Sequence, residues 1–191
     1  TISGSDRYLV VSVLDVAGDT VTGVTYNGVS MTQLGKINAA TSRYLYVYGL
    51  ANPTTGTNNI VASRSGTTSV FGFGAINLSG ANQTTTPIDA TATNNVTSAS
   101  PTINLTTISD NTAVIVSSST LNNTLAASTN LTGLVTDPSF GVSIMARSTT
   151  FPKTPAGTTT YTVTCPSGNT GLIAVSIAPS STFTPQAMWF M

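Results

Sequence analysis

The fold is decided by the stretch Val21-Thr-Gly-Val-Thr-Tyr-Asn-Gly-Val-Ser-Met-Thr32. An Asn-Gly pair between alternating apolar residues predicts a two-residue β-hairpin, because a type I′ turn needs positive φ at both central positions. In this register Tyr26 pairs with Val29, and Val24 pairs with Met31. These four apolar side chains then share one face and the polar residues between them share the other, so the stretch predicts an amphipathic antiparallel hairpin.

The period of two continues on both sides of the hairpin. Helix formers are scarce, because the chain has no Glu and two Lys, whereas the abundant Thr, Val and Ile favour strands. Turn clusters rich in Asn, Pro, Gly and Ser separate the alternating segments. We therefore expect further strands at residues 8–13, 43–50, 58–63, 70–78, 102–107, 112–118, 131–136, 140–146, 158–165 and 173–178.

These segments predict an all-β protein with about a dozen strands and no substantial helix. Their spacing favours an antiparallel two-sheet β-sandwich of jelly-roll or lectin-like type, with a closed barrel as the alternative. No linker divides the chain, so we expect residues 1–179 to form a single β-sandwich domain. The polar stretch 83–100 predicts a long loop or crossover.

A short echo links two of the expected strands. Ser5-Asp6-Arg7 precedes the apolar run at 8–13, and Ser109-Asp110-Asn111 precedes the run at 112–117. The echo could mark equivalent strands in two sheets. In a chain this rich in Ser and Thr, a match of this length also arises by coincidence, so both interpretations stay open.

The composition excludes several classes of function. Charged residues make up 6% of the chain, against about 25% in ordinary soluble domains. The absence of His and Glu excludes Ser-His-Asp catalysis and imidazole metal ligands. A net charge of zero without a basic run argues against nucleic-acid binding, and no apolar stretch approaches the roughly 20 residues that cross a bilayer. We therefore expect no enzyme, cofactor, metal, nucleic-acid partner or membrane insertion.

The same composition favours association. Net charge near zero removes the repulsion between copies, and two Lys cannot guard many sheet edges against pairing. Ser and Thr together number 60 of the 191 residues, so the expected surface is polar but neutral. This chemistry suits a subunit packed into an assembly better than a free monomer.

The C-terminal segment 180–191 is an apolar tail. It holds the only Trp of the chain, and its large apolar residues are Phe183, Met188, Trp189, Phe190 and Met191. Chain termini are normally polar and loosely ordered, so these five residues are candidates for an assembly contact. The tail can fold back onto its own sandwich, or it can dock on a neighbouring subunit or add a strand to its sheet.

Two other groups are candidate sites. Tyr44, Tyr46 and Tyr48 alternate along one expected strand and share a face, which can stack on sugar rings or pack between sheets or subunits. Asp15 and Asp19 lie in a Gly-containing segment, where carboxylates could hold Ca²⁺ or form a glycosidase pair. Their spacing matches no EF-hand loop, and ordinary turns use Asp in the same way.

Three segments resemble a known family. They are Val21-Thr-Gly-Val-Thr-Tyr-Asn-Gly-Val-Ser-Met-Thr-Gln33, Leu45-Tyr-Val-Tyr-Gly-Leu-Ala-Asn-Pro-Thr-Thr-Gly-Thr-Asn-Asn-Ile60, and Ile76-Asn-Leu-Ser-Gly80 leading into Gln83-Thr-Thr-Thr-Pro-Ile-Asp89. Together they resemble the lectin-like β-sandwich modules of bacteriophage virion proteins and bacterial surface proteins, over residues 5–178. The resemblance implies a β-sandwich and an exposed module in virion decoration, fibres or adhesion, and it implies no catalytic residues.

We therefore expect a non-enzymatic structural subunit of an extracellular or virion-surface assembly, of the kind that decorates a bacteriophage capsid or forms its fibres. Its partners would be further copies of the chain or another structural subunit of the particle. The alternative is a carbohydrate-binding module of a secreted or cell-surface protein. In that case Tyr44, Tyr46 and Tyr48 would contact a surface glycan.

Overall fold

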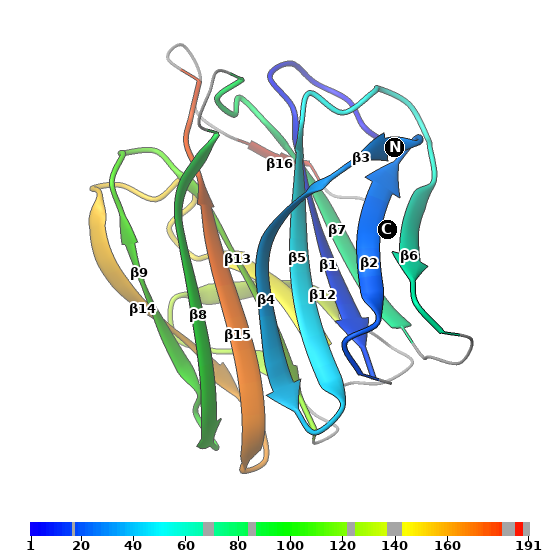
Figure 1. Ribbon diagram of the computed structural model, residues 1–191. Coiled ribbons are helices and arrows are strands. Elements are labelled where there is room, and N and C mark those ends of the chain that lie inside the picture. Colours follow the sequence, from blue (N-terminus) through cyan, green and yellow to red (C-terminus); the bar gives the residue numbers. More distant parts are fainter. Residues whose placement is uncertain are drawn as a thin grey trace.

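The computed structural model describes residues 1–16, 18–66, 71–83, 87–121, 125–136, 143–180 and 186–188. Within these residues the chain forms sixteen strands and no helix (Figure 1), which confirms the predicted all-β class. Three of the strands are only two or three residues long. The strands make four separate antiparallel sheets rather than the expected two. The described residues therefore contain no helix able to cross a membrane.

The first large sheet has the strand order β16-β7-β1-β5-β4, and a small sheet with the order β3-β2-β6 covers its outer face. The strands of the large sheet are β1 (Tyr8–Asp15), β4 (Thr32–Ala40), β5 (Arg43–Ala51), β7 (Phe71–Ser79) and β16 (Gln186–Met188). Those of the small sheet are β2 (Val21–Tyr26), β3 (Val29–Ser30) and β6 (Ile60–Arg64).

The second large sheet has the order β12-β13-β10-β15-β8, and its small sheet has the order β11-β14-β9. The large-sheet strands are β8 (Ile88–Ser98), β10 (Ala113–Thr120), β12 (Leu131–Thr136), β13 (Ser143–Ser148) and β15 (Gly168–Ile177). The small-sheet strands are β9 (Thr102–Thr107), β11 (Ala126–Ala127) and β14 (Gly157–Thr164). Of the two alternatives expected for 83–100, a long loop is wrong, because β8 fills most of the segment and turns Ala90, Ala92 and Val96 toward an apolar core. The crossover is confirmed, since the chain passes here from the large sheet of β7 to the large sheet of β15.

The hairpin that decides the fold is confirmed. Asn27 and Gly28 have positive φ values of 50° and 77°, and Tyr26 pairs with Val29. The amide of Met31 donates to the carbonyl of Val24 at 2.9 Å. One detail differs: Val29 is 50% exposed, because β3 is the edge strand of its small sheet.

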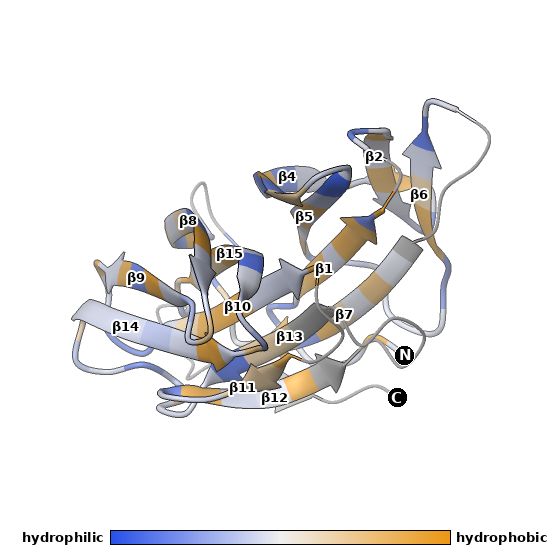
Figure 2. Ribbon diagram, turned by 90° about the horizontal axis from the view of Figure 1, so that it is seen from below, coloured by the Kyte–Doolittle hydropathy of each residue, from blue (hydrophilic) through white to orange (hydrophobic). Residues whose placement is uncertain are grey.

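Three apolar cores lie between four layers. The central core fills the space between the two large sheets, with side chains such as Val10, Leu78, Ile115 and Ile173. Each outer core fills the space between a large sheet and its small sheet. Figure 1 shows β9 and β14 on one side of the molecule and β2 and β6 on the other, and Figure 2 shows the same layers from below.

The large sheets of the two halves have the same topology, whereas the third strand of the small sheet is β3 beside β2 in one half and β9 beside β14 in the other. We call β1–β8 the first half and β9–β16 the second half. β1 lies between β5 and β7, and β10 lies between β13 and β15. β4 pairs with β5 as β12 pairs with β13, and β2 pairs with β6 as β11 pairs with β14. The echoed segments at 5–7 and 109–111 therefore precede equivalent central strands.

The two large sheets touch closely where β4 meets β15. A Cβ atom added to Gly171 would lie 2.8 Å from the Cα of Ala39 and 2.9 Å from Cγ2 of Ile37. A Cβ atom added to Gly35 would lie 2.7 Å from Cγ2 of Ile173. These separations are below van der Waals contact, so only glycine lets the backbones approach this far.

Gly171→Ala tests this contact. We expect it to lower the free energy of unfolding by about 1–3 kcal/mol, because the new methyl group meets the backbone of Ala39. The control is Gly133→Ala in the same large sheet, where the added Cβ finds its nearest atom at 3.8 Å. Chemical denaturation of both variants measures the difference, and equal stabilities would contradict the close contact.

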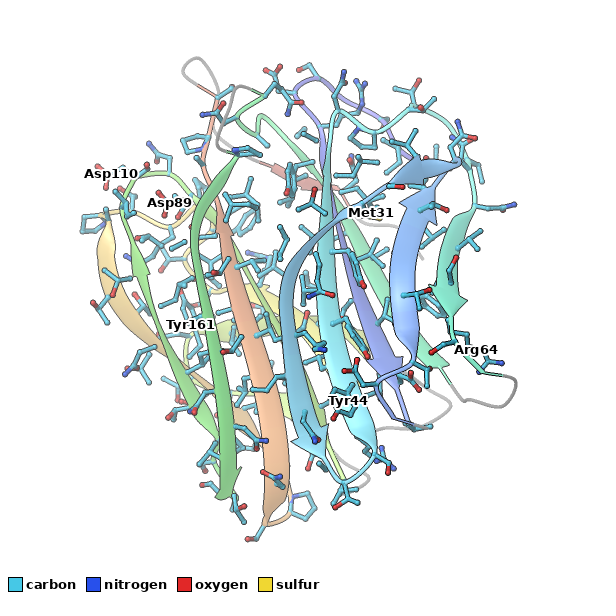
Figure 3. All side chains as sticks on the ribbon, viewed as in Figure 1. Met31, Tyr44, Arg64, Asp89, Asp110 and Tyr161 are labelled. Carbon is cyan, nitrogen blue, oxygen red and sulfur yellow. The ribbon has the colours of Figure 1, made fainter. Side chains whose placement is uncertain are left out.

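Buried tyrosines give the fold a pH dependence. Tyr8 is 3% exposed, and burial raises its pKa to about 12. Burial also raises the pKa values of Tyr46, Tyr48 and Tyr161, the last of which is labelled in Figure 3. An unfolded tyrosine has a pKa of about 10, so the unfolded chain loses these protons before the folded chain does.

We therefore expect full stability below about pH 10 and a progressive loss above it, through pH 12 in the case of Tyr8. Tyr8→Phe removes one titrating group and should reduce the loss between these pH values by about 1–3 kcal/mol. Urea denaturation as a function of pH measures both slopes. An unchanged slope in the variant would show that Tyr8 ionises equally in the two states.

Candidate functional site

The last strand of each half lies in the large sheet of the other half. β8 follows β7 in the chain but pairs with β15 of the second half. β16 follows β15 but pairs with β7 of the first half, and Figure 1 shows it beside the end of that strand. β16 thus takes the position on β7 that β8 takes on β15. The two halves hold together by exchanging their terminal strands.

The two segments that lead into the exchanged strands also bind each other. Ala81 and Pro179 form an antiparallel bridge. The amide of Asn82 donates to the carbonyl of Ala178 at 2.8 Å, and the amide of Ser180 donates to the carbonyl of Gly80 at 2.8 Å. The crossing point is therefore fixed by reciprocal backbone hydrogen bonds, which do not depend on side-chain identity.

The two exchanged strands differ in the number of residue pairs that the described part of the chain shows. β8 makes ten residue pairs with β15. In the described part of the tail, β16 makes three pairs with β7: Gln186 with Ser79, Ala187 with Leu78, and Met188 with Asn77. Of the tail candidates, Met188 is the last residue of β16, whereas Phe183, Trp189, Phe190 and Met191 lie outside the described residues. The described part of the tail thus adds a strand to its own chain.

The tyrosine stripe packs inside the first half. Tyr46 is 0% and Tyr48 is 4% exposed, and both belong to the core between β5 and the small sheet. Neighbouring ring centroids of the stripe are 6.4 Å apart. Tyr44, at the start of β5 (Figure 3), is half-buried, with the Lys36 ammonium 5.9 Å from its ring centroid. The rings of Tyr46 and Tyr48 therefore offer no open face to a sugar.

The acidic candidates anchor loops around this stripe. Asp19 accepts hydrogen bonds from Lys36 Nζ at 2.7 Å and from the Tyr46 hydroxyl at 2.6 Å. These bonds, the one from Lys36 first, hold the pKa of Asp19 below its usual value. Asp15 is buried and accepts from the amide and hydroxyl of Thr20. No cluster of three or more His, Cys, Asp or Glu side chains occurs in the described ranges.

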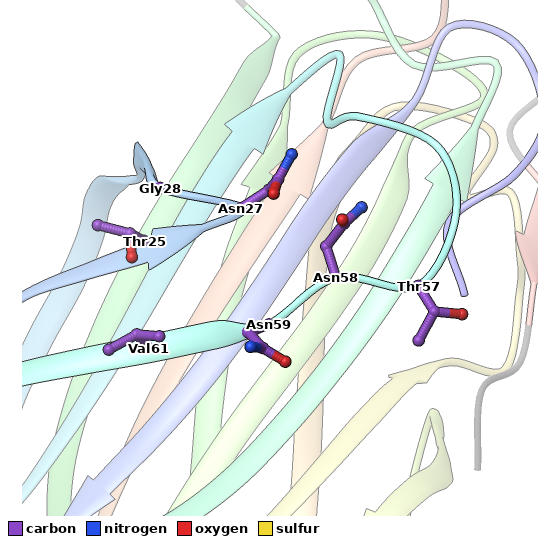
Figure 4. A pocket seen from close by; sticks show the side chains of 7 residues that line it. All are labelled: Thr25, Asn27, Gly28, Thr57, Asn58, Asn59 and Val61. Atoms are coloured by element: carbon purple, nitrogen blue, oxygen red, sulfur yellow. The ribbon is translucent and has the colours of Figure 1, made fainter.

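A surface pocket of about 390 Å³ opens beside the Asn27-Gly28 turn (Figure 4). The turn forms one wall, and the segment that leads into β6 forms the other. All seven lining residues are uncharged: Thr25, Asn27, Gly28, Thr57, Asn58, Asn59 and Val61. The volume lies in the range of small-molecule pockets. Sequence reasoning missed it, because its two walls lie about 30 residues apart and each resembles an ordinary turn.

Hydrogen bonds hold the two walls of the pocket in place. The amide of Asn27 donates to the carbonyl of Asn59 at 3.0 Å. Asn58 Nδ2 donates to the Tyr26 hydroxyl at 3.1 Å, which itself donates to the carbonyl of Thr54 at 3.1 Å. Val61 adds an apolar surface, since it is 51% exposed. The arrangement can bind a neutral ligand with several hydroxyl groups.

Comparisons with known proteins add no further constraint. No protein-family model, no curated protein and no solved structure matches this chain. The functional interpretation therefore depends on the strand-exchange edge and the pocket themselves.

Proposed function

We propose that this chain is a non-enzymatic structural subunit of an extracellular or virion-surface assembly, of the kind that decorates a bacteriophage capsid or forms its fibres. We also propose that its sheets form a β-sandwich of the lectin-like or jelly-roll type. The β-sheets would form the rigid part of the subunit, and strand pairing at the edge of β7 would connect it to its neighbour. Its partners would be further copies of the chain or another subunit of the same particle.

The observation that carries the proposal is the addition of β16 to the edge of β7. Strand addition uses backbone hydrogen bonds, so it joins bodies without a specialised side-chain interface. The same mode already joins the two halves of this chain through β8 and β15. A protein built by strand exchange between its own halves is suited to attach further bodies at such an edge.

The neutral outer surface supports the same function. The exposed positions of β9 and β14 carry no charge; they are Thr102, Asn104, Thr106, Thr158, Thr160 and Thr164. Two cross-strand pairs among them form hydrogen bonds, Thr106 with Thr158 at 2.7 Å and Thr160 with Asn104 at 2.6 Å. Surfaces with a net charge keep copies of a protein apart by electrostatic repulsion, and this uncharged surface lacks that repulsion.

Truncation after Pro179 tests the assembly function, because it removes β16. We expect the full chain to form a defined oligomer as its concentration rises, and the truncated chain to stay a folded monomer. Light scattering behind size exclusion gives the masses, and circular dichroism checks that the truncated chain keeps its β signal. Monomers for both chains at all concentrations would contradict the assembly function.

The pocket beside the Asn27-Gly28 turn favours a second candidate function. Its uncharged amides and hydroxyls fit the hydroxyl groups of a neutral saccharide, and Val61 supplies apolar contact. We propose the carbohydrate-binding alternative at this place and not on the tyrosine stripe. A volume of about 390 Å³ suits a mono- or disaccharide unit of a surface glycan.

Asn59→Ala tests the pocket. If the pocket binds neutral glycans, the full chain should be retained on some members of a neutral glycan array, and the variant should lose most of that retention. The matched control is Asn38→Ala on β4, because Asn38 is also an exposed Asn but does not line the pocket. If the unmodified chain is retained on no neutral glycan, the result would contradict this carbohydrate-binding function.

A further inference from the structure

We propose that the edge of β7 accepts β16 from a second copy of this chain, so that two copies exchange their C-terminal strands and form a reciprocal dimer. This inference rests on the proposed assembly function and names its partner. The exchanged part is β16 (Gln186–Met188), and the occupant of the edge is the same described strand in either arrangement.

The first step is the internal precedent. The edge of β15 accepts its outer strand from the first half, and the edge of β7 accepts its outer strand from the second half. Neither large sheet uses the terminal strand of its own half. The edges of β7 and β15 thus each pair with a strand from the other half of the chain. Because this pairing uses backbone groups, the strand can also come from a separate molecule.

The second step is the cost of release. β16 leaves β7 when the three described pairs separate, whereas release of β8 would break ten pairs. Fewer of the described backbone pairs therefore break when β16 opens than when β8 opens. The hydrogen bonds that break on opening form again on the second copy, and the balance between the two arrangements then follows protein concentration.

The third step is that the body stays intact during exchange. The hydrogen bonds of Asn82 with Ala178 and of Ser180 with Gly80 lie before the exchanged segment. They hold the chain through Ser180 against its own first half in the closed and the exchanged arrangement. The described residues of the three apolar cores all precede this point, so exchange of β16 does not move them.

The test places one cysteine on each of two full-length variants, Ser79→Cys and Gln186→Cys. These positions are direct partners across the β7–β16 ladder, at a Cα separation that a disulfide can span. A disulfide between the two variants forms at this ladder only when β16 of one copy pairs with β7 of the other. The native Cys165 is 8% exposed and present in every variant, so it does not bias the comparison.

Mixed at high concentration and oxidised, the two variants should yield a disulfide-linked dimer, identified by non-reducing gel and mass spectrometry. The matched control replaces Gln186→Cys by Ala187→Cys. Successive positions of a strand alternate between the two faces of its sheet, so we expect the yield of this control with Ser79→Cys to be roughly ten-fold lower. Equal yields would mean random collision and would overturn the exchange.

A locked variant separates this inference from the assembly function. Ser79→Cys and Gln186→Cys in one chain, oxidised in dilute solution, tie β16 to its own β7. We expect this variant to stay monomeric where the unmodified chain dimerises, and to dimerise again after reduction. Assembly of the locked variant at the level of the unmodified chain would overturn strand exchange but leave the assembly function standing on another surface. A monomeric unmodified chain would overturn both.

Discussion

The packing of the two large sheets against each other is the constraint on which the rest of the structure depends. All eight residues of β1 and all eight of β10 are buried, so each central strand must be covered on both faces. A sandwich of two sheets leaves one face of each sheet to solvent. Four layers are the arrangement that buries both faces of both strands, and the glycines at the β4–β15 contact allow the inner layers to close.

The exchange of terminal strands follows from this arrangement. Two large sheets with the same topology pack face to face, and the segment that follows the last strand of each half's own sheet, β7 or β15, reaches the edge of the opposite sheet. The bridge between Ala81 and Pro179 marks where the two segments cross. Strand exchange then joins the halves by backbone pairing, in addition to the apolar contact between their inner faces. The pairing of the exchanged strands β8 and β16 and the central apolar core therefore depend on the same face-to-face packing of the large sheets.

Local patterns in the sequence predicted local structure well. The Asn-Gly signal predicted the hairpin, since a type I′ turn depends only on adjacent residues, and alternation predicted most strands. The predicted number of sheets was wrong, because alternation assigns a residue to a face but does not say which layer covers that face. The segment of β8 was predicted as a long loop or crossover and not as a strand, because its inward residues include Ala90 and Ala92, which give a weak apolar signal. The buried tyrosines and the pocket depend on contacts between distant segments, and no local pattern encodes them.

The short length of β16 raises the question of what sets its register. A slip by one residue would turn every side chain of a strand to the opposite face, and the described residues of β16 oppose such a slip with three pairs. The bridge at Pro179 and the hydrogen bond of Ser180 with Gly80 hold the chain a few residues before β16. They limit where the strand can start on its own β7, whereas on a second copy that limit comes from how the two bodies meet. Register on β7 thus links the crossing point of the halves to the geometry of any larger assembly.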